Sequence, residues 1–268
     1  MADRAALLTE LIAAHEAVYD GVLAAVADLD DADWTRPTGC PGWDVRAQLA
    51  HVIGIERMVL GEAPPADEVP DAPHLRNDFG RLIERDVVLR AGRTPDELRA
   101  EAREVFDRRL EVLRATTPGE LDEEVDTLLG RRRLVSFLRT RLFDMVSHER
   151  DVRAAVDRLH GFDGPHVPVG VEQVLHAWAR TLPAKVDRSG TVCFEVAGGP
   201  VVALDLATGT LRRDVDATAE VDATIRLTAA QVLALGGGRD DAPTTGDLEV
   251  TGDLGLATTA VAAAAVTP

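Results

Sequence analysis

Lysine, cysteine and long apolar runs are scarce in this 268-residue chain. Lys185 is the only lysine, and the two cysteines, Cys40 and Cys193, lie far apart and outside any Cys-x-x-Cys pair. This argues against a disulfide framework and against a cysteine-rich metal site. No stretch of about 18 apolar residues occurs, so we expect no membrane-spanning helix. The N-terminal segment carries acids where a signal peptide needs an apolar core. We therefore expect a cytoplasmic protein with reduced cysteines.

Positive charge is also in short supply. The 46 acidic residues outnumber the 29 lysines and arginines, and the formal net charge is −17. Nucleic-acid backbones and anionic membrane surfaces are both bound through basic patches. We therefore expect no nucleic acid and no membrane as partner, but a small molecule. The chain is expected to be a monomer or a small homo-oligomer.

Apolar residues recur at helical spacing in the first 160 residues. The helices are expected at 4–30, 45–61, 75–116 and 131–159, with a proline-rich connection at 61–73. Asp44 is a typical N-cap residue, and Thr94, Pro95 and Glu97 form the pattern of a capping box that interrupts the third segment. Four long amphipathic segments predict a helical bundle.

The pattern changes near residue 163. One more helix is expected at 168–183, and short β-rich runs then alternate with Gly and Asp turns. The expected strands are 191–196, 200–206, 223–228 and 247–252, and two short helices are expected at 229–235 and 253–265. The chain is therefore predicted to hold two domains. Residues 1–162 form a four-helix bundle, and residues 163–268 form a smaller α+β domain.

A carboxylate and a histidine stand four residues apart in "FDMVSHERDVR". Asp144 and His148 would project from one face of their helix, one turn apart. His51, on the helix expected at 45–61, could supply a third ligand from across the bundle. Two imidazoles and a carboxylate leave a fourth position open, as catalytic zinc sites do. The spacing alone also fits an exposed ion pair on one helix and a packed core histidine on the other.

Two motifs make the chain similar to the mycothiol-dependent maleylpyruvate isomerase family. The first, "TGCPGWDVRAQLAH", has a Cys-Pro-Gly-Trp turn, a Val-Arg helix start and His51. The second, "RLFDMVSHERDVRAA", has an acid, Asp144, four residues before His148, followed by Glu-x-Asp-hydrophobic-Arg. The resemblance covers essentially the whole chain. It implies a DinB-like bundle that binds metal through these three residues, followed by a sterol-carrier-like domain. The family usually has glutamate, one methylene longer, in place of Asp144.

The resemblance also implies zinc or another divalent metal, and mycothiol, a small thiol of actinobacteria. Zinc deprotonates a thiol that it binds, and the thiolate is the nucleophile. Addition to a conjugated cis double bond, rotation and loss of the thiol would isomerise a substrate such as maleylpyruvate. Release of the adduct would instead make an S-transferase of detoxification or natural-product biosynthesis. We expect a mycothiol-dependent isomerase or S-transferase acting on a small electrophile. A non-catalytic small-ligand-binding protein is the alternative.

Two arginines are candidate catalytic residues, because arginine recognises carboxylates through two parallel hydrogen bonds. Arg141 precedes His148 on the same helix and could reach the pocket or pair with a surface acid. Arg239, in "LGGGRDD", resembles a glycine-arginine turn of the family. It could lean into a cleft between the domains or stay solvated. No cofactor-binding residues beyond the metal ligands are assigned.

The remaining polar and aromatic candidates have simpler interpretations. Asp151 could orient His148 through a hydrogen bond, but it also fits a helix salt bridge. His15 is expected to be a hydrogen-bonded core histidine, and Trp43 is expected to pack at the end of the bundle. Cys193 is expected to be buried. His74, His160, His166 and His176 are given no role.

Overall fold

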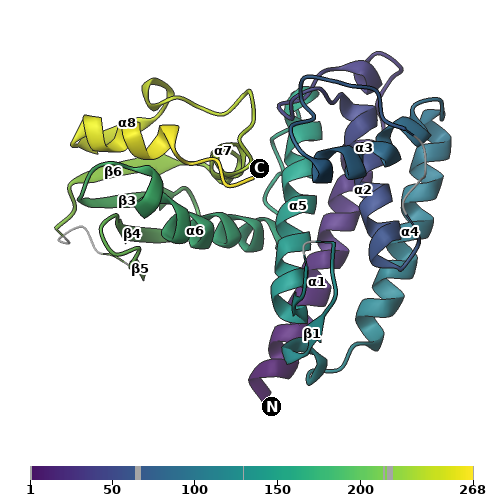
Figure 1. Ribbon diagram of the computed structural model, residues 1–268, viewed down its shortest axis with the longest axis horizontal. Coiled ribbons are helices and arrows are strands. Elements are labelled where there is room, and N and C mark those ends of the chain that lie inside the picture. The colour runs from purple at the N-terminus through teal and green to yellow at the C-terminus, as the bar shows by residue number, and fades with distance from the viewer. Residues whose placement is uncertain (1, 64–67, 129, 214, 216–219, 268) are drawn as a thin grey trace. The chain divides into compact units, whose positions relative to one another are not determined.

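The chain forms two compact units, Met1–His166 and Val167–Pro268. The sequence analysis placed the boundary after residue 162. The computed structural model describes residues 2–63, 68–128, 130–213, 215 and 220–267. Residues 64–67 of the expected proline-rich connection lie outside this description. Figure 1 shows helices in the first unit and a mixed sheet with helices in the second. No helix within the described ranges is long and apolar enough to cross a membrane.

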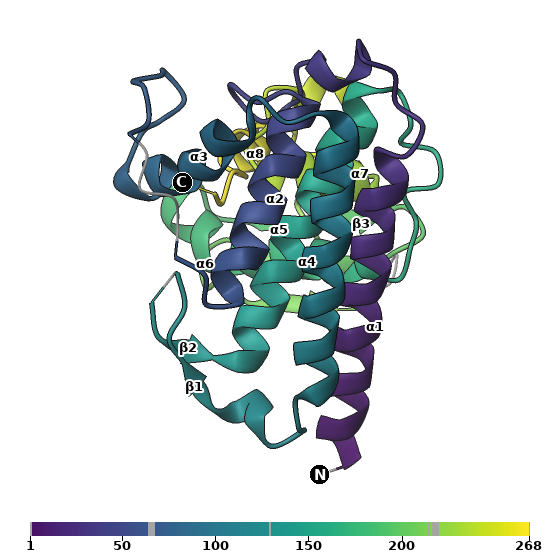
Figure 2. The ribbon, with the colours of Figure 1, turned by 90° about the vertical axis from the view of Figure 1, so that its right-hand side faces the viewer.

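Four helices form the bundle of the first unit. They are α1 (Ala2–Ala25), α2 (Val45–Val59), α4 (Pro95–Ala115) and α5 (Leu134–Ala155). Both α1 and α2 pack against α4 and α5, which closes the bundle (Figure 2). A further helix, α3 (Asp78–Arg90), packs on α2. The short elements η1 (Asp33–Thr35), η2 (Glu120–Asp122), β1 (Glu124–Val125) and β2 (Arg132–Arg133) lie in the connections.

The helices begin where the capping residues predict. The Asp44 carboxylate accepts a hydrogen bond from the backbone N–H of Ala47 at 2.8 Å, so α2 begins at the next residue after its cap. Thr94 and Glu97 form a reciprocal capping box, with Pro95 at the first helical position of α4. The segment expected at 75–116 is therefore two helices. These caps fix where α2 and α4 begin.

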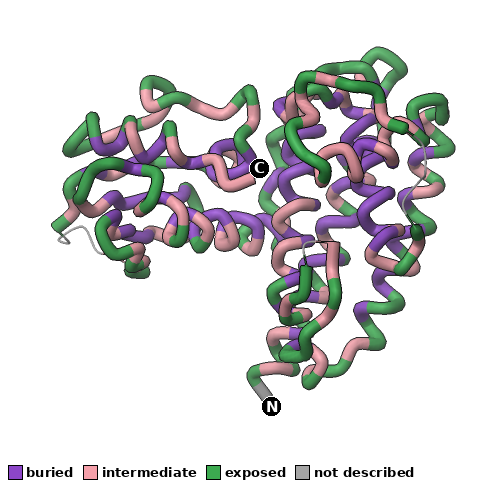
Figure 3. Tube along the Cα trace, viewed as in Figure 1, coloured by how far each residue is buried: buried purple, intermediate pink, exposed green. Residues whose placement is uncertain are grey.

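Buried residues recur along the helices of the bundle (Figure 3). Most are apolar, and the largest that are fully buried include Tyr19, Leu49, Ile53, Leu98, Phe106, Leu113, Leu138, Leu142 and Met145. Burial of this apolar surface is the main driving force for folding the unit. Charged side chains lie among them, however. The buried Glu149 accepts a hydrogen bond from Arg153 Nε and pairs with His166, whose Nε2 lies 2.7 Å from Glu149 Oε2. His166 therefore has a buried partner, although the sequence assigned it no role.

The second unit is built on a five-stranded sheet of order β5-β4-β3-β6-β7. The strands are β3 (Thr191–Val196), β4 (Val201–Asp205), β5 (Leu211–Arg213), β6 (Ala223–Leu227) and β7 (Glu249–Gly252). β3 and β6 are parallel, with Phe194 opposite Ile225, and the other neighbours are antiparallel. Four strands were expected. The fifth, β5, is a three-residue edge strand with exposed arginines and gives no hydrophobic alternation.

Three helices complete this unit: α6 (His166–Lys185), α7 (Ala229–Gly236) and α8 (Leu254–Ala262). The Trp178 ring of α6 packs on Phe194 of β3 with 4.7 Å between ring centroids. Its indole Nε1–H donates to the carbonyl of Ala264, just after α8, at 2.7 Å. One tryptophan therefore joins α6 both to the sheet and to the C-terminal helix. Cys193 is buried in β3, as expected.

Candidate metal centre

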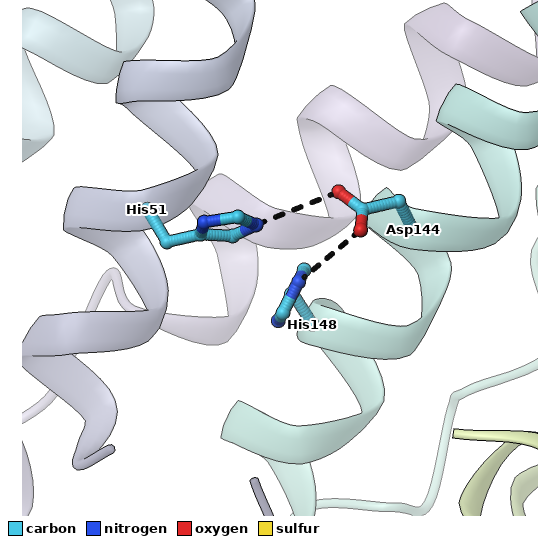
Figure 4. Close-up of side chains that lie close together, drawn as sticks. All are labelled: His51, Asp144 and His148. Atoms are coloured by element: carbon cyan, nitrogen blue, oxygen red, sulfur yellow. Dashed lines mark ion pairs between the residues drawn. The ribbon is translucent and has the colours of Figure 1, made fainter. Parts of the chain in front are cut away.

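His51, Asp144 and His148 come together inside the first unit. His51 is on α2, and the other two are on α5, one turn apart (Figure 4). The Nε2 atom of His51 lies 3.7 Å from Asp144 Oδ2, and the Nε2 atom of His148 lies 3.6 Å from Asp144 Oδ1. One nitrogen or oxygen from each residue lies within 4.8 Å of the other two. Within the described residues this is the set of three that could hold a metal ion.

The orientation of His148 is set from the neighbouring helix. Its Nδ1 lies 2.5 Å from the side-chain oxygen of Gln48, which is completely buried on α2. An amide oxygen only accepts, so Nδ1 carries a proton, and in the neutral ring the lone pair is then on Nε2, toward Asp144. The amide nitrogen of Gln48 in turn donates to the hydroxyl of Thr38 at 2.6 Å. This is the hydrogen-bond pattern that orients histidine ligands in metal sites.

His51 is held neutral by its surroundings. Burial lowers its pKa to about 4, and the nearby His148 adds to that effect, while Asp144 opposes it. A neutral imidazole has a lone pair available to a metal ion. The ring packs against Trp43 with 4.7 Å between centroids, and the centroid of the His148 ring lies 4.5 Å from that of His51. The Nδ1 atom of His51 is buried and has no hydrogen-bond partner among the described residues.

Trp43 belongs to the site as well as to the core. Its ring lies near both imidazoles, at 4.7 Å from His51 and 5.9 Å from His148. The indole Nε1–H donates to Glu84 of α3 at 2.8 Å. The preceding Gly42 has a φ of +80° and lies against His74, where a Cβ would come within 2.3 Å of the ring. Glycine is therefore required for the turn that places the tryptophan.

Asp144 is the ligand candidate with the greatest exposure. Its side chain is 31% exposed, whereas those of His51 and His148 are 4% and 6% exposed. Burial would raise its pKa, but the neighbouring Arg141, together with the histidines, holds the pKa well below its usual range. Asp144 is therefore ionised at neutral pH, as a metal ligand must be.

Arg141 pairs with the buried Glu56 and with the partly exposed Asp144. Its Nη1–H donates to Asp144 Oδ2 at 2.7 Å, and its Nε and Nη2 donate to Glu56 Oε1 at 3.0 and 2.7 Å. The other oxygen of Glu56 accepts from Arg109 at 2.7 Å and from the Tyr19 hydroxyl at 2.9 Å. The two arginines outweigh burial and lower the pKa of Glu56 to about 2. A network of fully ionised groups thus lies beside the triad.

The other sequence candidates lie elsewhere or have other partners. Arg239 is in the second unit, just after α7, where its Nη1–H donates to the carbonyl of Gly237. A role for it at the site stays a prediction. Asp151 Oδ2 is 4.0 Å from His148 Nδ1 and Oδ1 pairs with Arg150 at 3.2 Å, so the orienting hydrogen bond of His148 comes from Gln48 instead. His15 is a buried core histidine whose Nδ1 bonds to the carbonyl of Leu11.

Sequence reasoning missed three residues that the geometry adds to the site. Gln48 and Glu56 interrupt the apolar run of α2, three residues before and five residues after His51. Both are almost completely buried. A polar residue inside an apolar helix needs a partner, and this was the available signal. Arg109 gave no signal of its own, because α4 carries many arginines.

The protein is therefore a two-unit protein: a helical bundle with a possible metal site is followed by an α/β unit with a five-stranded sheet. Residues 15–153 match the mycothiol maleylpyruvate isomerase N-terminal domain, and residues 172–264 match the SCP-2 sterol transfer family. The first match spans more than half of the chain. The chain belongs to the mycothiol maleylpyruvate isomerase family.

Solved structures agree with this assignment at the level of the fold. The crystal structure of the mycothiol-dependent maleylpyruvate isomerase is 16% identical, with a TM-score of 0.55, over 88% of this chain and 92% of that chain. The crystal structure of a histidine-to-alanine mutant of the mycothiol-dependent maleylpyruvate isomerase is 15% identical, with a TM-score of 0.53 and the same coverage. No curated protein matches the chain.

Proposed function

We propose that this protein is a metal-dependent enzyme that uses the thiol mycothiol on a small electrophilic substrate. The proposed reaction is cis–trans isomerisation of a conjugated acid, as in maleylpyruvate isomerases. Transfer of the thiol to the substrate is the alternative outcome of the same chemistry. Family membership and the possible metal site together support this proposal.

The observation that carries the proposal is the convergence of two imidazole Nε2 atoms and one carboxylate in the interior of the bundle. The donor set fits a metal ion, because two neutral imidazoles and a carboxylate are common ligands of zinc and leave a further position open. Their ionisation fits as well. His51 is neutral and Asp144 is ionised near pH 7, so no proton has to be displaced from either.

Each residue at the proposed metal site would have its own role. His51, Asp144 and His148 would hold the ion, and Gln48 would keep Nε2 of His148 free to bind it. A bound divalent ion lowers the pKa of a thiol, so that the thiolate is present at neutral pH. Trp43 shields the two imidazoles from water on its side. Asp144 is the most exposed of the three, so small molecules would approach the ion from its side.

The first test is the metal content of the protein, purified without chelator or nickel affinity and measured by elemental mass spectrometry. We expect about one metal ion per chain in the wild type, and almost none in His51→Ala and His148→Ala. His15→Ala is the control, because this histidine is equally buried but bonded within α1, and it should keep the metal. A wild type that neither contains metal nor takes up added zinc contradicts the proposal, as does full retention in His51→Ala.

The thiol is tested next, by thermal unfolding with and without mycothiol. A ligand that binds the folded state raises the melting temperature, so millimolar mycothiol should stabilise the zinc-loaded protein and not the zinc-free protein. Product analysis then separates the two outcomes. An isomerised substrate with the thiol recovered indicates an isomerase, and a stable thiol adduct indicates a transferase. No stabilisation by the thiol favours a non-catalytic ligand-binding protein.

A further inference from the structure

We infer that Glu56 is a positioning residue for the metal ligand Asp144 and acts on it through Arg141. The inference rests on the proposed metal site. Glu56 lies on α2, whereas Arg141 and Asp144 lie three residues apart on α5. One guanidinium therefore connects a carboxylate of one helix to the candidate ligand on the other.

Three hydrogen bonds fix the orientation of the Arg141 guanidinium between Glu56 and Asp144. Two of its nitrogens donate to the same oxygen of Glu56, at 2.7 and 3.0 Å, and the third donates to Asp144 Oδ2 at 2.7 Å. A planar guanidinium held at two points places its third donor at a fixed position. The carboxylate of Asp144 is therefore fixed in rotation, with Oδ1 toward His148.

The negative charge of Glu56 gives a second reason to assign it a role at the metal site. Arg141 stands directly beside a candidate ligand, where an unbalanced positive charge would repel a divalent cation. Glu56 supplies the negative charge that balances it. With Arg109 on its other oxygen, the group of two acids and two arginines sums to zero before any metal is bound. Loss of the Glu56 charge alone would leave both arginines buried and in excess.

The test is a double-mutant cycle read as zinc affinity, measured by competition with a chelator of known affinity. Glu56→Gln keeps the shape and removes the charge, and we expect zinc binding about 10- to 100-fold weaker than in the wild type. In an Arg141→Gln background the same change has nothing to act through, so we expect less than about a threefold further effect. Equal effects of Glu56→Gln in both backgrounds, or none in either, overturn the inference.

Controls separate positioning from general damage. Glu101→Gln removes the charge from another largely buried ion pair of the same unit, with Arg90 at 2.9 Å, and should leave zinc affinity unchanged. Far-UV circular dichroism of each zinc-free variant checks folding. Should Glu56→Gln not fold, Arg141→Lys carries the test: it keeps the charge but not the three-point bridge, and should weaken zinc about tenfold. Wild-type affinity in a folded Arg141→Lys then overturns the inference.

The two hypotheses fail in different ways. A wild-type protein that binds no zinc overturns the proposed metal site and this inference together. A wild-type protein that binds zinc, with Glu56→Gln binding equally well, overturns the inference alone. Activity is not needed for either result.

Discussion

The two units bury different kinds of side chain. Within the described residues, the buried polar and charged side chains all lie between His15 and His166, in the first unit. The buried side chains of the second unit are apolar, from Val167 to Ala264. Its charged residues pair at the surface instead, as Arg226 does with Glu195 and Glu249.

This difference in buried charge indicates which buried residues stabilise the fold and which belong to a functional site. A buried charge costs free energy unless it is paired, and an apolar core of similar volume is often at least as stable. The second unit has the less costly kind of core, because its described buried side chains are apolar. The first unit does not: its buried Glu56, Arg109 and Arg141 lie beside the candidate metal ligands. Other buried charges of the unit pair elsewhere, as Glu149 does with His166. Buried ionisable groups that are costly for stability concentrate at functional sites.

The largest loss of stability is expected when the buried carboxylate of Glu56 is removed, and this change tests the contrast between the two units. Glu56→Leu leaves Arg109 and Arg141 buried without their carboxylate, and we expect a loss of about 3–5 kcal/mol of unfolding free energy. Glu172→Leu is the matched change in the second unit, where Arg213 pairs with Glu172 at the surface, and should cost less than about 1 kcal/mol. Urea unfolding followed by circular dichroism measures both. Equal losses would contradict the contrast between the units.

Acid should distinguish the units next. Burial lowers the pKa values of His15 and His51 to about 4, from an ordinary 6.5, in the metal-free protein. Between these values the unfolded chain binds more protons than the folded chain, so stability falls as the pH falls through this window. From pH 7.5 to 5.5 we expect a loss of about 1 kcal/mol for each histidine.

Urea unfolding at both pH values measures this loss. In a Trp178→Phe background the fluorescence comes from Trp34 and Trp43, and so reports on the first unit. His15→Leu should remove about half of the pH dependence, and His176→Leu, which alters an exposed histidine of the second unit, should remove none. An unchanged slope in His15→Leu would show that its folded-state pKa is not depressed.

A smaller effect, on zinc affinity, is expected when the buried amide of Gln48 is removed from the first unit. Gln48→Leu removes the acceptor of His148 Nδ1, so the proton of that ring is no longer kept away from Nε2, and we expect about tenfold weaker zinc binding. Calorimetric zinc titration measures it. The control is Gln231→Leu, which removes a helix-capping glutamine of the second unit and should not change zinc affinity. Undiminished affinity in Gln48→Leu would exclude its role in fixing the ring.

The smallest effect is expected on the sheet surface. Arg226→Gln removes two exposed ion pairs across β3, β6 and β7, and should cost less than about 1 kcal/mol. Because salt screens exposed charges, the cost should shrink when sodium chloride is raised to about 1 M. Thermal unfolding at low and high salt measures it. A loss as large as that of Glu56→Leu would mean that surface charge, too, stabilises the second unit.

Local signals in the sequence were sufficient for most of the fold. Asp44 and Thr94 cap α2 and α4 as expected, because an N-cap bond involves only neighbouring residues. The four longer strands were predicted from β-rich runs between Gly and Asp turns, whereas β5 is only three residues long and two of these are exposed arginines. Asp144 and His148 could be paired from their spacing on one helix. Their approach to His51 rested on the resemblance to a family.

Contacts between helices were not predictable in the same way. Arg141 was expected either in the pocket or on a surface acid, and its actual partner Glu56 lies 85 residues away. Gln48 and His148 are 100 residues apart. Such pairs depend on how α2 and α5 are rotated about their axes. That rotation results from the packing of all the helices and is not recorded in any single segment.

The contacts of α5 also determine where the chain cannot change in length. Consecutive residues of an α-helix point about 100° apart, so His148 faces the candidate metal site while Glu149 faces α1. There its carboxylate occupies the space left by Gly21, where a Cβ would come within 2.5 Å, and it pairs with Arg153 and His166. Deleting or inserting one residue between Asp144 and His148 would rotate both His148 and Glu149 by about 100° relative to Asp144. The contacts on the two sides of the change could then not all be kept. Homologous proteins with this arrangement should therefore vary in their loops and keep this segment free of insertions and deletions.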